Sequence, residues 1–311
     1  MTFDFPSSAA DLGRYPRDMV GYGRNAPDPR WPGGANVAVQ FVLNYEEGGE
    51  RNILHGDECS EFYLTEHLPG PGRAGARHDT AESIFEYGSR AGFWRLWHMF
   101  NDRKLPLTVF GVGLALARNP EAVAAMREAD WEIASHGLRW IDHRHMSEDE
   151  ERAYIDASIA MHDDVCGAAP RGWYMGRTSD NTVALLAERG LAYVSDSYSD
   201  DLPYRIDTPS GPQLMLPYTL ETNDMRFLTP QGFGTSDDFY GYLRDTFDVL
   251  WREGDKGRPR MMNIGLHTRI SGRPGRAAAV ERFLDYLGTR DRTWITTRVA
   301  IADHWINNVR V

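Results

Sequence analysis

Five segments that lie far apart in the sequence carry side chains able to catalyse an acid–base reaction. They contain an acidic pair (Glu46 and Glu47), His136, Arg171, an aspartate-rich run over residues 196–201, and His267. Carboxylate and imidazole groups can accept and donate the protons of a hydrolysis, and a neighbouring arginine keeps a carboxylate charged. Taken singly, each segment is more often structural than catalytic. An active site is therefore favoured only if the fold brings these segments together.

Alternating strand-like and helix-like segments are expected to position these side chains. Apolar runs of strand length lie at residues 36–44, 107–112, 131–135, 172–174, 191–195, 214–218, 261–266 and 294–297. Helical patterns lie at residues 90–102, 120–129, 147–165, 182–189, 237–252, 277–287 and 299–307. Such alternation predicts a parallel sheet with helices outside it, although it does not separate a closed barrel from an open sheet. The reactive segments follow strand ends, which meet at one face of a barrel.

Composition narrows the class of protein. The chain has 311 residues and a net charge of −11, which argues against a nucleic-acid or anionic-membrane partner. The two cysteines, Cys59 and Cys166, predict reduced thiols rather than a disulfide framework. No secretory signal or membrane span is visible, so we expect a cytoplasmic protein that acts on a small molecule.

Two loop-rich stretches frame the first predicted strand. Residues 1–34 are rich in Pro, Gly and Arg and predict an extended arm, so residues 35–311 would form the single catalytic unit. The second stretch, at about residues 47–80, is long enough to have a function. We expect its part around Asn52, His55 and Arg77 to close over a substrate.

The five segments resemble, in order and spacing, the five motifs of the polysaccharide deacetylase family. The matching positions are residues 44–48 (Asn-Tyr-Glu-Glu-Gly), residues 136–140, residues 171–174, the trio Asp196, Ser199 and Asp201, and finally His267. The resemblance covers about residues 35–300. It implies an α/β fold, a distorted (β/α)₇ barrel, preceded here by the N-terminal arm.

The departures from the family pattern concern its metal. Family members bind a divalent metal with residues that match Glu47, His136 and Trp140. An indole cannot ligate zinc, because its only nitrogen is a hydrogen-bond donor, and two protein ligands are too few for a catalytic zinc site. We therefore expect no metal and no other cofactor, with His143 or His145 as the alternative source of a third ligand.

Longer stretches resemble one branch of the family, the metal-independent allantoinases of bacterial purine catabolism. Examples are residues 44–50, 87–92, 139–142, 200–204 and 223–227. This resemblance implies hydrolysis of the hydantoin-ring amide of allantoin, or of a related cyclic ureide, to give allantoate. It also implies a homotetramer, in which the arm is a candidate subunit contact.

The resemblance assigns a role to each candidate residue. Glu46 would be the general base, held charged by Arg171, and His267 the general acid, oriented by Asp201. The backbone N–H of Tyr174 and the side chain of His136 would stabilise the oxyanion. Glu47 and Trp140 would complete the substrate site, the indole by stacking on the flat ring.

Three other functions remain open from sequence alone. They are a metal-dependent deacetylase of a polysaccharide or other amide, a hydrolase of a different cyclic amide, and a binding protein that has kept the barrel and lost its chemistry. A few pocket residues would decide among them.

Overall fold

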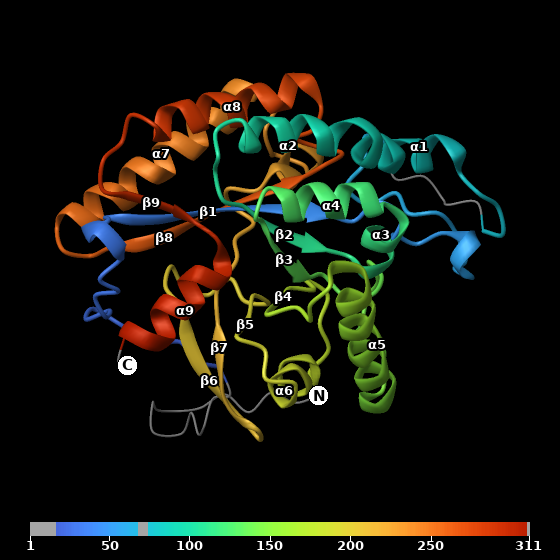
Figure 1. The fold of residues 1–311 in the computed structure, drawn as a ribbon, viewed down its shortest axis with the longest axis horizontal. Coiled ribbons are helices and arrows are strands. Elements are labelled where there is room, and N and C mark those ends of the chain that lie inside the picture. Colours follow the sequence, from blue (N-terminus) through green and yellow to red (C-terminus); the bar gives the residue numbers. More distant parts are fainter. Residues whose placement is uncertain (1–16, 68–73, 310–311) are drawn as a thin grey trace, which may run out of the picture.

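A single curved sheet organises the computed structural model, which describes residues 17–67 and 74–309 (Figure 1). Its strand order is β6-β7-β5-β4-β3-β2-β1-β8, with β9 paired to β1. The strands are β1 (Val37–Tyr45), β2 (Thr108–Gly111), β3 (Glu132–Ser135), β4 (Gly172–Trp173), β5 (Tyr193–Val194), β6 (Tyr204–Thr208), β7 (Gly211–Met215), β8 (Arg260–His267) and β9 (Thr293–Thr296).

All the strand pairs are parallel except β6 with β7. Strand β1 pairs with three strands, with β8 along one edge and with β9 followed by β2 along the other. No ladder joins β8 to β6 within the described residues, so the sheet is a curled half-barrel. The prediction of an α/β fold with a distorted barrel is confirmed.

Helices cover the outer face of this sheet, and α7 and α8 pack on each other beside β8 (Figure 1). The α-helices are α1 (Asp79–Tyr87), α2 (Phe93–Asn101), α3 (Gly113–Arg118), α4 (Pro120–Glu128), α5 (Glu148–Cys166), α6 (Thr182–Glu188), α7 (Ser236–Asp255), α8 (Pro274–Leu287) and α9 (Arg298–Asn308). The short helical turns are η2 (Pro32–Gly34), η3 (Ile53–His55), η4 (Gly88–Gly92) and η5 (Asp224–Leu228).

Strand β1 shows how the sequence directs side chains to the two faces of the sheet. Val39 and Leu43 belong to the apolar cluster under the outer helices, whereas Ala38 and Val42 belong to the cluster inside the curl. Because successive side chains alternate between faces, Glu46 continues the inward series and Glu47 the outward one. The two glutamates therefore point to opposite sides of the sheet.

A buried arginine at the start of α9 closes one end of the curl. The side chain of Arg298 donates to Gln40 Oε1 at 2.7 Å, to Ser195 Oγ at 2.8 Å and to the carbonyl of Pro217 at 3.0 Å. These contacts satisfy a charged group that would otherwise be costly to bury. The open end of the curl is thus the opposite one, where the carboxyl ends of the parallel strands lie.

Most of the predicted elements are present, including the capping box of Ser147 that opens α5. The structure adds strand β6 and helices α1 and α3, which were not predicted. The strand predicted at residues 214–218 overlaps the end of β7, which pairs with β6 as a hairpin. The missed helices are short, and α1 begins inside the stretch predicted as a loop. Residues 1–16 of the predicted arm lie outside the described residues.

Candidate active site

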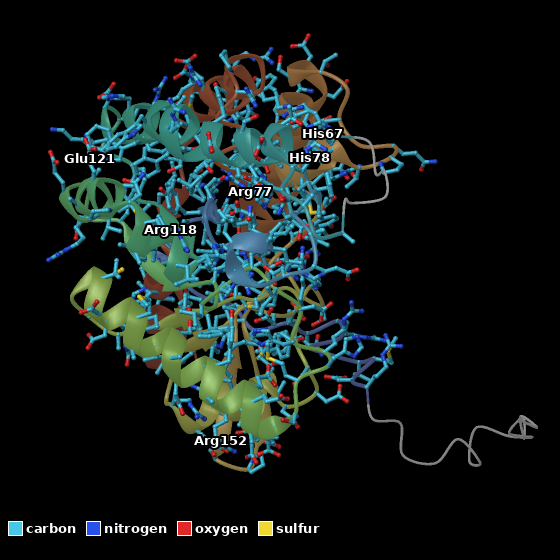
Figure 2. All side chains as sticks on the ribbon, turned by 90° about the vertical axis from the view of Figure 1, so that its right-hand side faces the viewer. His67, Arg77, His78, Arg118, Glu121 and Arg152 are labelled. Carbon is cyan, nitrogen blue, oxygen red and sulfur yellow. The ribbon has the colours of Figure 1, made fainter. Side chains whose placement is uncertain are left out.

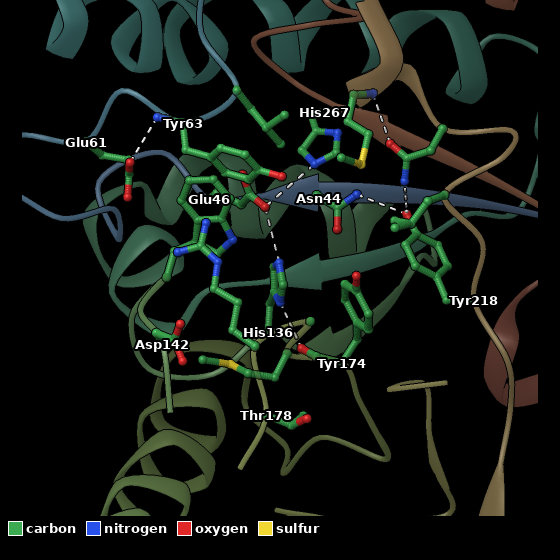
Figure 3. A pocket seen from close by; sticks show the side chains of 18 of the residues that line it. Asn44, Glu46, Glu61, Tyr63, His136, Asp142, Tyr174, Thr178, Tyr218 and His267 are labelled. Atoms are coloured by element: carbon green, nitrogen blue, oxygen red, sulfur yellow. Dashed lines mark hydrogen bonds and ion pairs between the residues drawn. The ribbon is translucent and has the colours of Figure 1, made fainter. Parts of the chain in front are cut away.

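The carboxyl ends of β1 and β8 open into a cavity of about 760 Å³ (Figure 3). Glu46, His136 and His267 line its inner end, and the labelled side chains of His136 and His267 flank Glu46. The remaining lining residues are Asn44, Arg51, Glu61, Tyr63, Leu64, Trp140, Asp142, Arg144, Tyr174, Met175, Gly176, Arg177, Thr178, Tyr198, Tyr218, Leu220, Asn223 and Met225. Two of the predicted catalytic residues, Glu46 and His267, thus lie together here.

Glu46 is a buried carboxylate surrounded by cationic partners. Its Oε2 accepts a hydrogen bond from Arg269 Nη1 at 2.6 Å. Its Oε1 lies 3.2 Å from His136 Nε2 and 3.7 Å from His267 Nε2. Burial alone would raise the pKa of Glu46, but Arg269, His267 and His136 outweigh it and hold the pKa well below its usual value. Glu46 is therefore ionised, the form that a general base needs.

His267 is oriented by an aspartate from η5. Asp224 Oδ1 accepts from His267 Nδ1 at 2.6 Å, while Asp224 Oδ2 accepts the backbone N–H of His267 at 2.7 Å. Burial lowers the pKa of His267, but the charges of Asp224 and Glu46 more than compensate and raise it. The ring therefore carries a proton on Nε2, facing the cavity, where it can act as a general acid.

His136 has a hydrogen-bond acceptor at each ring nitrogen. Nδ1 lies 2.8 Å from the carbonyl oxygen of Tyr174, and Nε2 faces Glu46. A carbonyl only accepts, so Nδ1 must be the donor there. The other ring nitrogen, Nε2, lies between Glu46 and the cavity, where an N–H would donate to Glu46 or to an oxygen of a bound substrate.

Arg269 was not among the predicted site residues, yet it holds the site together. Its guanidinium is buried against two rings, 4.6 Å from the centre of Phe85 and 5.2 Å from that of Trp140. Besides Glu46, its Nη1 lies 3.5 Å from Glu47 Oε1. The available signal was its position, two residues beyond His267 at the same strand end.

A polar wall lies beside the two histidines. Asn44 Nδ2 and Asn223 Nδ2 each donate to the hydroxyl of Tyr218 at 3.2 Å. Gly265 on β8 leaves the space for this wall, because a Cβ there would lie 2.3 Å from both Tyr218 and Asn223. The wall gives the cavity fixed hydrogen-bonding groups without adding charge.

Two predicted catalytic residues, Arg171 and Asp201, lie outside the cavity, and other residues take the positions predicted for them. Arg171 is exposed and pairs with Asp303 at 2.6 Å, so it does not hold Glu46; Arg269 does. Asp201 is also exposed and does not line the cavity, and Asp224 is the aspartate that orients His267. The family motif led to the wrong residue in both cases because equivalent groups come here from other segments.

Glu47 does not line the substrate cavity. Its carboxylate accepts the hydroxyl of Thr268 and faces a second cavity of about 270 Å³. Arg77, labelled in Figure 2, lines that second cavity, together with Asn52 and His55. The part of the stretch around these three residues, expected to close over the substrate, therefore lines the second cavity, whereas residues 61, 63 and 64 of the same stretch line the substrate cavity. Burial raises the pKa of Glu47, and this effect exceeds the opposing effect of Arg269.

Tyr174 and Trp140 line the cavity, but with changed roles. The backbone N–H of Tyr174 donates to the carbonyl of Ser135 at 3.0 Å within the sheet, so it is not available as an oxyanion donor. Its hydroxyl lies 2.9 Å from that of Tyr198. Trp140 is only 5% exposed and contacts Arg177, whose guanidinium lies 4.2 Å from its ring centre. Its ring is a wall of the cavity and offers little open surface for stacking.

The residues at the family's metal-ligand positions do not fit a metal. Trp140 has no acceptor nitrogen, and Glu47 faces away from the cavity that contains His136. Of the two alternative ligands, His143 is buried against Glu151 at 3.0 Å and His145 is exposed. Within residues 17–67 and 74–309, no group of three His, Cys, Asp or Glu side chains is arranged to hold a metal.

The comparisons with known proteins agree with this fold. Residues 75–194 match the family model described as polysaccharide deacetylase. A Schizosaccharomyces pombe protein described among the polysaccharide deacetylases is 42% identical, over 93% of this chain and 96% of that protein. The chain therefore belongs to the polysaccharide deacetylase family, a family of hydrolases.

Two crystal structures are closely similar to this one. A probable polysaccharide deacetylase from Pseudomonas aeruginosa PAO1 is 50% identical, with a TM-score of 0.92 over 95% of this chain and 99% of that one. The PuuE allantoinase is 49% identical, with a TM-score of 0.93 over 96% of this chain and 100% of that one. No helix in the described part of the chain is long and apolar enough to cross a membrane.

Proposed function

We propose that this protein is an allantoinase, which hydrolyses the hydantoin-ring amide of allantoin to allantoate without a metal. The observation that carries the proposal is the inner end of the cavity, where Glu46 lies between Arg269, His136 and His267. A charged base, a protonated acid and further donors are the groups that a metal-free amide hydrolysis needs. The similarity to the PuuE allantoinase supports the choice of substrate.

In the proposed reaction, a water molecule beside Glu46 loses a proton to its carboxylate and attacks the ring carbonyl. His136 Nε2–H then donates to the developing oxyanion, since the backbone N–H of Tyr174 is used in the sheet. The C–N bond of the ring breaks as His267 gives its proton to the leaving nitrogen. That nitrogen is flanked by two carbonyl groups, so it leaves more readily than the nitrogen of a simple acetamide.

Two positioning residues prepare these groups. Arg269 keeps Glu46 ionised, and Asp224 keeps His267 protonated and turned toward the cavity. Both act through short, buried contacts, which are stronger than the same contacts in water. The product gains a carboxylate, so the reaction is driven forward by loss of a proton from the new acid.

Turnover of allantoin by the purified protein, before and after dialysis against a chelator, tests the proposal. We expect equal rates, and a chelator-sensitive rate restored by zinc would contradict the metal-free mechanism. Release of acetate from acetylated oligosaccharides, without allantoin turnover, would favour a deacetylase. Turnover of a different cyclic amide alone would assign another substrate to the same chemistry. Glu46→Gln should abolish turnover, with Glu86→Gln on the exposed side of α1 as its control.

We also propose that the enzyme works in cytoplasmic purine catabolism as a homotetramer, with residues 1–34 as an arm and residues 35–311 as the catalytic unit. The resemblance to the allantoinase branch supports this. Light scattering of the intact chain and of a variant lacking residues 1–34 tests it. We expect a tetramer for the first and smaller species for the second.

A further inference from the structure

We propose that Arg177 determines substrate specificity by binding the carbonyl oxygen of the acyclic ureido arm that allantoin carries on its ring. This inference rests on the proposed function, because it assumes a cyclic ureide in the cavity. It concerns a different part of the substrate from the bond that is broken.

Arg177 lines the same cavity as Glu46 and the two histidines. Its guanidinium lies 4.2 Å from the ring centre of Trp140 and 5.2 Å from that of Tyr63. These two rings are themselves stacked, with their centres 5.9 Å apart. Stacking uses the flat face of a guanidinium and leaves its N–H groups free to point along the plane.

The guanidinium of Arg177 has no carboxylate partner in the described part of the chain, where no Asp or Glu oxygen lies within 4.0 Å of it. Other cavity arginines differ: Arg144 is paired with Asp142, and Arg51 is exposed. Arg144 has the largest effect in lowering the pKa of Asp142, and the charge of Arg177 in the same cavity also lowers it, but Asp142 forms no direct ion pair with Arg177. A half-buried arginine held on aromatic rings without a directly bound carboxylate retains its hydrogen-bonding capacity for a ligand.

The backbone that carries Arg177 is fixed from below by a buried polar cluster. The carbonyl of Arg177 accepts the N–H of His143 at 3.0 Å. His143 Nδ1 in turn lies 3.0 Å from Glu151, whose carboxylate also accepts the hydroxyls of Ser179 and Thr182. Because this cluster is anchored on α5, binding does not have to order the segment first, which favours affinity.

The indole of Trp140 lies close both to Arg177 and to Arg269 of the reaction centre. Arg269, which holds Glu46, lies 5.2 Å from this ring, and Arg177 lies 4.2 Å from it. Glu46, Trp140 and Arg177 line one cavity, so a hydantoin ring with its amide at Glu46 can extend a substituent along the Trp140 wall to Arg177. A urea carbonyl is a neutral acceptor, and a guanidinium offers it N–H donors with full charge. The geometry thus fits a cyclic ureide with a second urea group better than a bare ring.

Two substrates, two variants of Arg177 and one control variant test this role. Allantoin carries the arm, and hydantoin is the same ring without it. Arg177→Met should lower kcat/KM for allantoin roughly 10- to 100-fold, the effect of losing a hydrogen bond to a charged group, mainly through KM. Hydantoin turnover should change by no more than about 3-fold, because it lacks the group that Arg177 binds. Arg177→Lys should recover part of the loss. Arg292→Met is the control, because Arg292 lies over the ring of Trp251 outside the cavity. It should leave kcat/KM unchanged for both allantoin and hydantoin.

If hydantoin reacts too slowly for kinetics, the binding of both compounds to the inactive Glu46→Gln variant provides a second measurement. In Glu46→Gln, adding Arg177→Met should weaken allantoin binding and leave hydantoin binding unchanged in calorimetry. Equal losses for both substrates would overturn the role of Arg177 while leaving the proposed function intact. If the wild-type protein opens neither ring, the proposed function fails, and the assignment of Arg177 fails with it.

Discussion

Two glutamates that are neighbours in the sequence have opposite electrostatic environments. Both are buried and both contact Arg269, but Glu46 also faces His136 and His267. Burial raises the pKa of either carboxyl group. For Glu46 the three cationic partners prevail and the pKa falls, whereas for Glu47 burial prevails and the pKa rises. Of the two carboxyl groups, Glu46 is the one whose surroundings favour the charged form.

Arg269→Met should move the acid limb of the kcat/KM profile of allantoin hydrolysis to higher pH. Arg269 lowers the pKa of Glu46, so its removal raises that pKa, and protonated Glu46 is inactive up to a higher pH. Removal of an opposite charge at this distance predicts a shift of roughly 1–3 pH units. Arg269→Lys should shift the limb less, because it keeps the charge. An acid limb that stays in place in both variants would show that another group controls it.

Asp224→Asn should move the basic limb of the profile to lower pH. Asp224 raises the pKa of His267, so the neutral amide lowers it and His267 loses its proton earlier. We expect kcat to fall by about 10²- to 10⁴-fold, the range for loss of a general acid. Asp201→Asn, outside the cavity, is the control. If the two variants behave alike, Asp224 does not orient His267.

The sequence predicted which segments meet but not every side chain that acts. Glu46, His136 and His267 were found because the ends of parallel strands meet at one face. Arg269 and Asp224 were missed because an arginine two residues past a strand, or an aspartate in a short 3₁₀ helix, has no periodic signature. The family motif assigned the role of Arg269 to Arg171 and the role of Asp224 to Asp201. A motif specifies a residue type at a strand end, but it does not show which segment brings that residue type to the active site.

At the scale of elements, β1 and β8 deliver the reacting groups and α9 supports them from below. Both strands alternate between the two faces, so Asn44 on β1 and Glu46 directly after that strand point inward, as do Asn263 and His267 on β8. Below them, Arg298 of α9 donates to Gln40 on β1 and also to Asn263. Its position could not be predicted, because a helical pattern does not show that an arginine at the N-terminus enters a barrel.

Arg298→Met should destabilise the fold by about 3 kcal/mol or more, the usual cost of breaking a buried charged network. The methionine would leave Gln40, Ser195 and two backbone carbonyls without their donor. Urea unfolding monitored by tryptophan fluorescence measures the loss. Arg244→Met, which removes an exposed ion pair with Asp245, should cost about 0–1 kcal/mol. Similar midpoints for the two variants would contradict a supporting role for Arg298.

At the scale of the whole molecule, the end of β1 separates two cavities, each lined by one of the two neighbouring glutamates. The larger one contains Glu46, and the smaller one contains Glu47 and Glu50 on the other side of the sheet. Glu50 accepts the backbone N–H of Gly48 at 2.5 Å, and burial raises its pKa to about 7. The fold therefore buries the carboxyl group of Glu50 in surroundings that disfavour its charged form. Glu50 lies close in sequence to Glu46, the proposed base.

This arrangement makes the stability of the whole protein depend on pH through Glu50. The folded protein holds a proton on Glu50 up to about pH 7, whereas the unfolded chain loses it near the ordinary glutamate pKa. The folded state thus binds more protons in that window, so the contribution of Glu50 to stability falls as pH rises through it. Glu50→Gln removes this dependence and keeps an acceptor for Gly48. The variant should be more stable than wild type by about 2–3 kcal/mol at pH 8 and nearly equal to it at pH 4–5. Urea unfolding at both pH values measures the difference, with Glu86→Gln as the exposed control. A gain or loss of the same size at both pH values would mean that Glu50 carries no raised pKa in the folded protein.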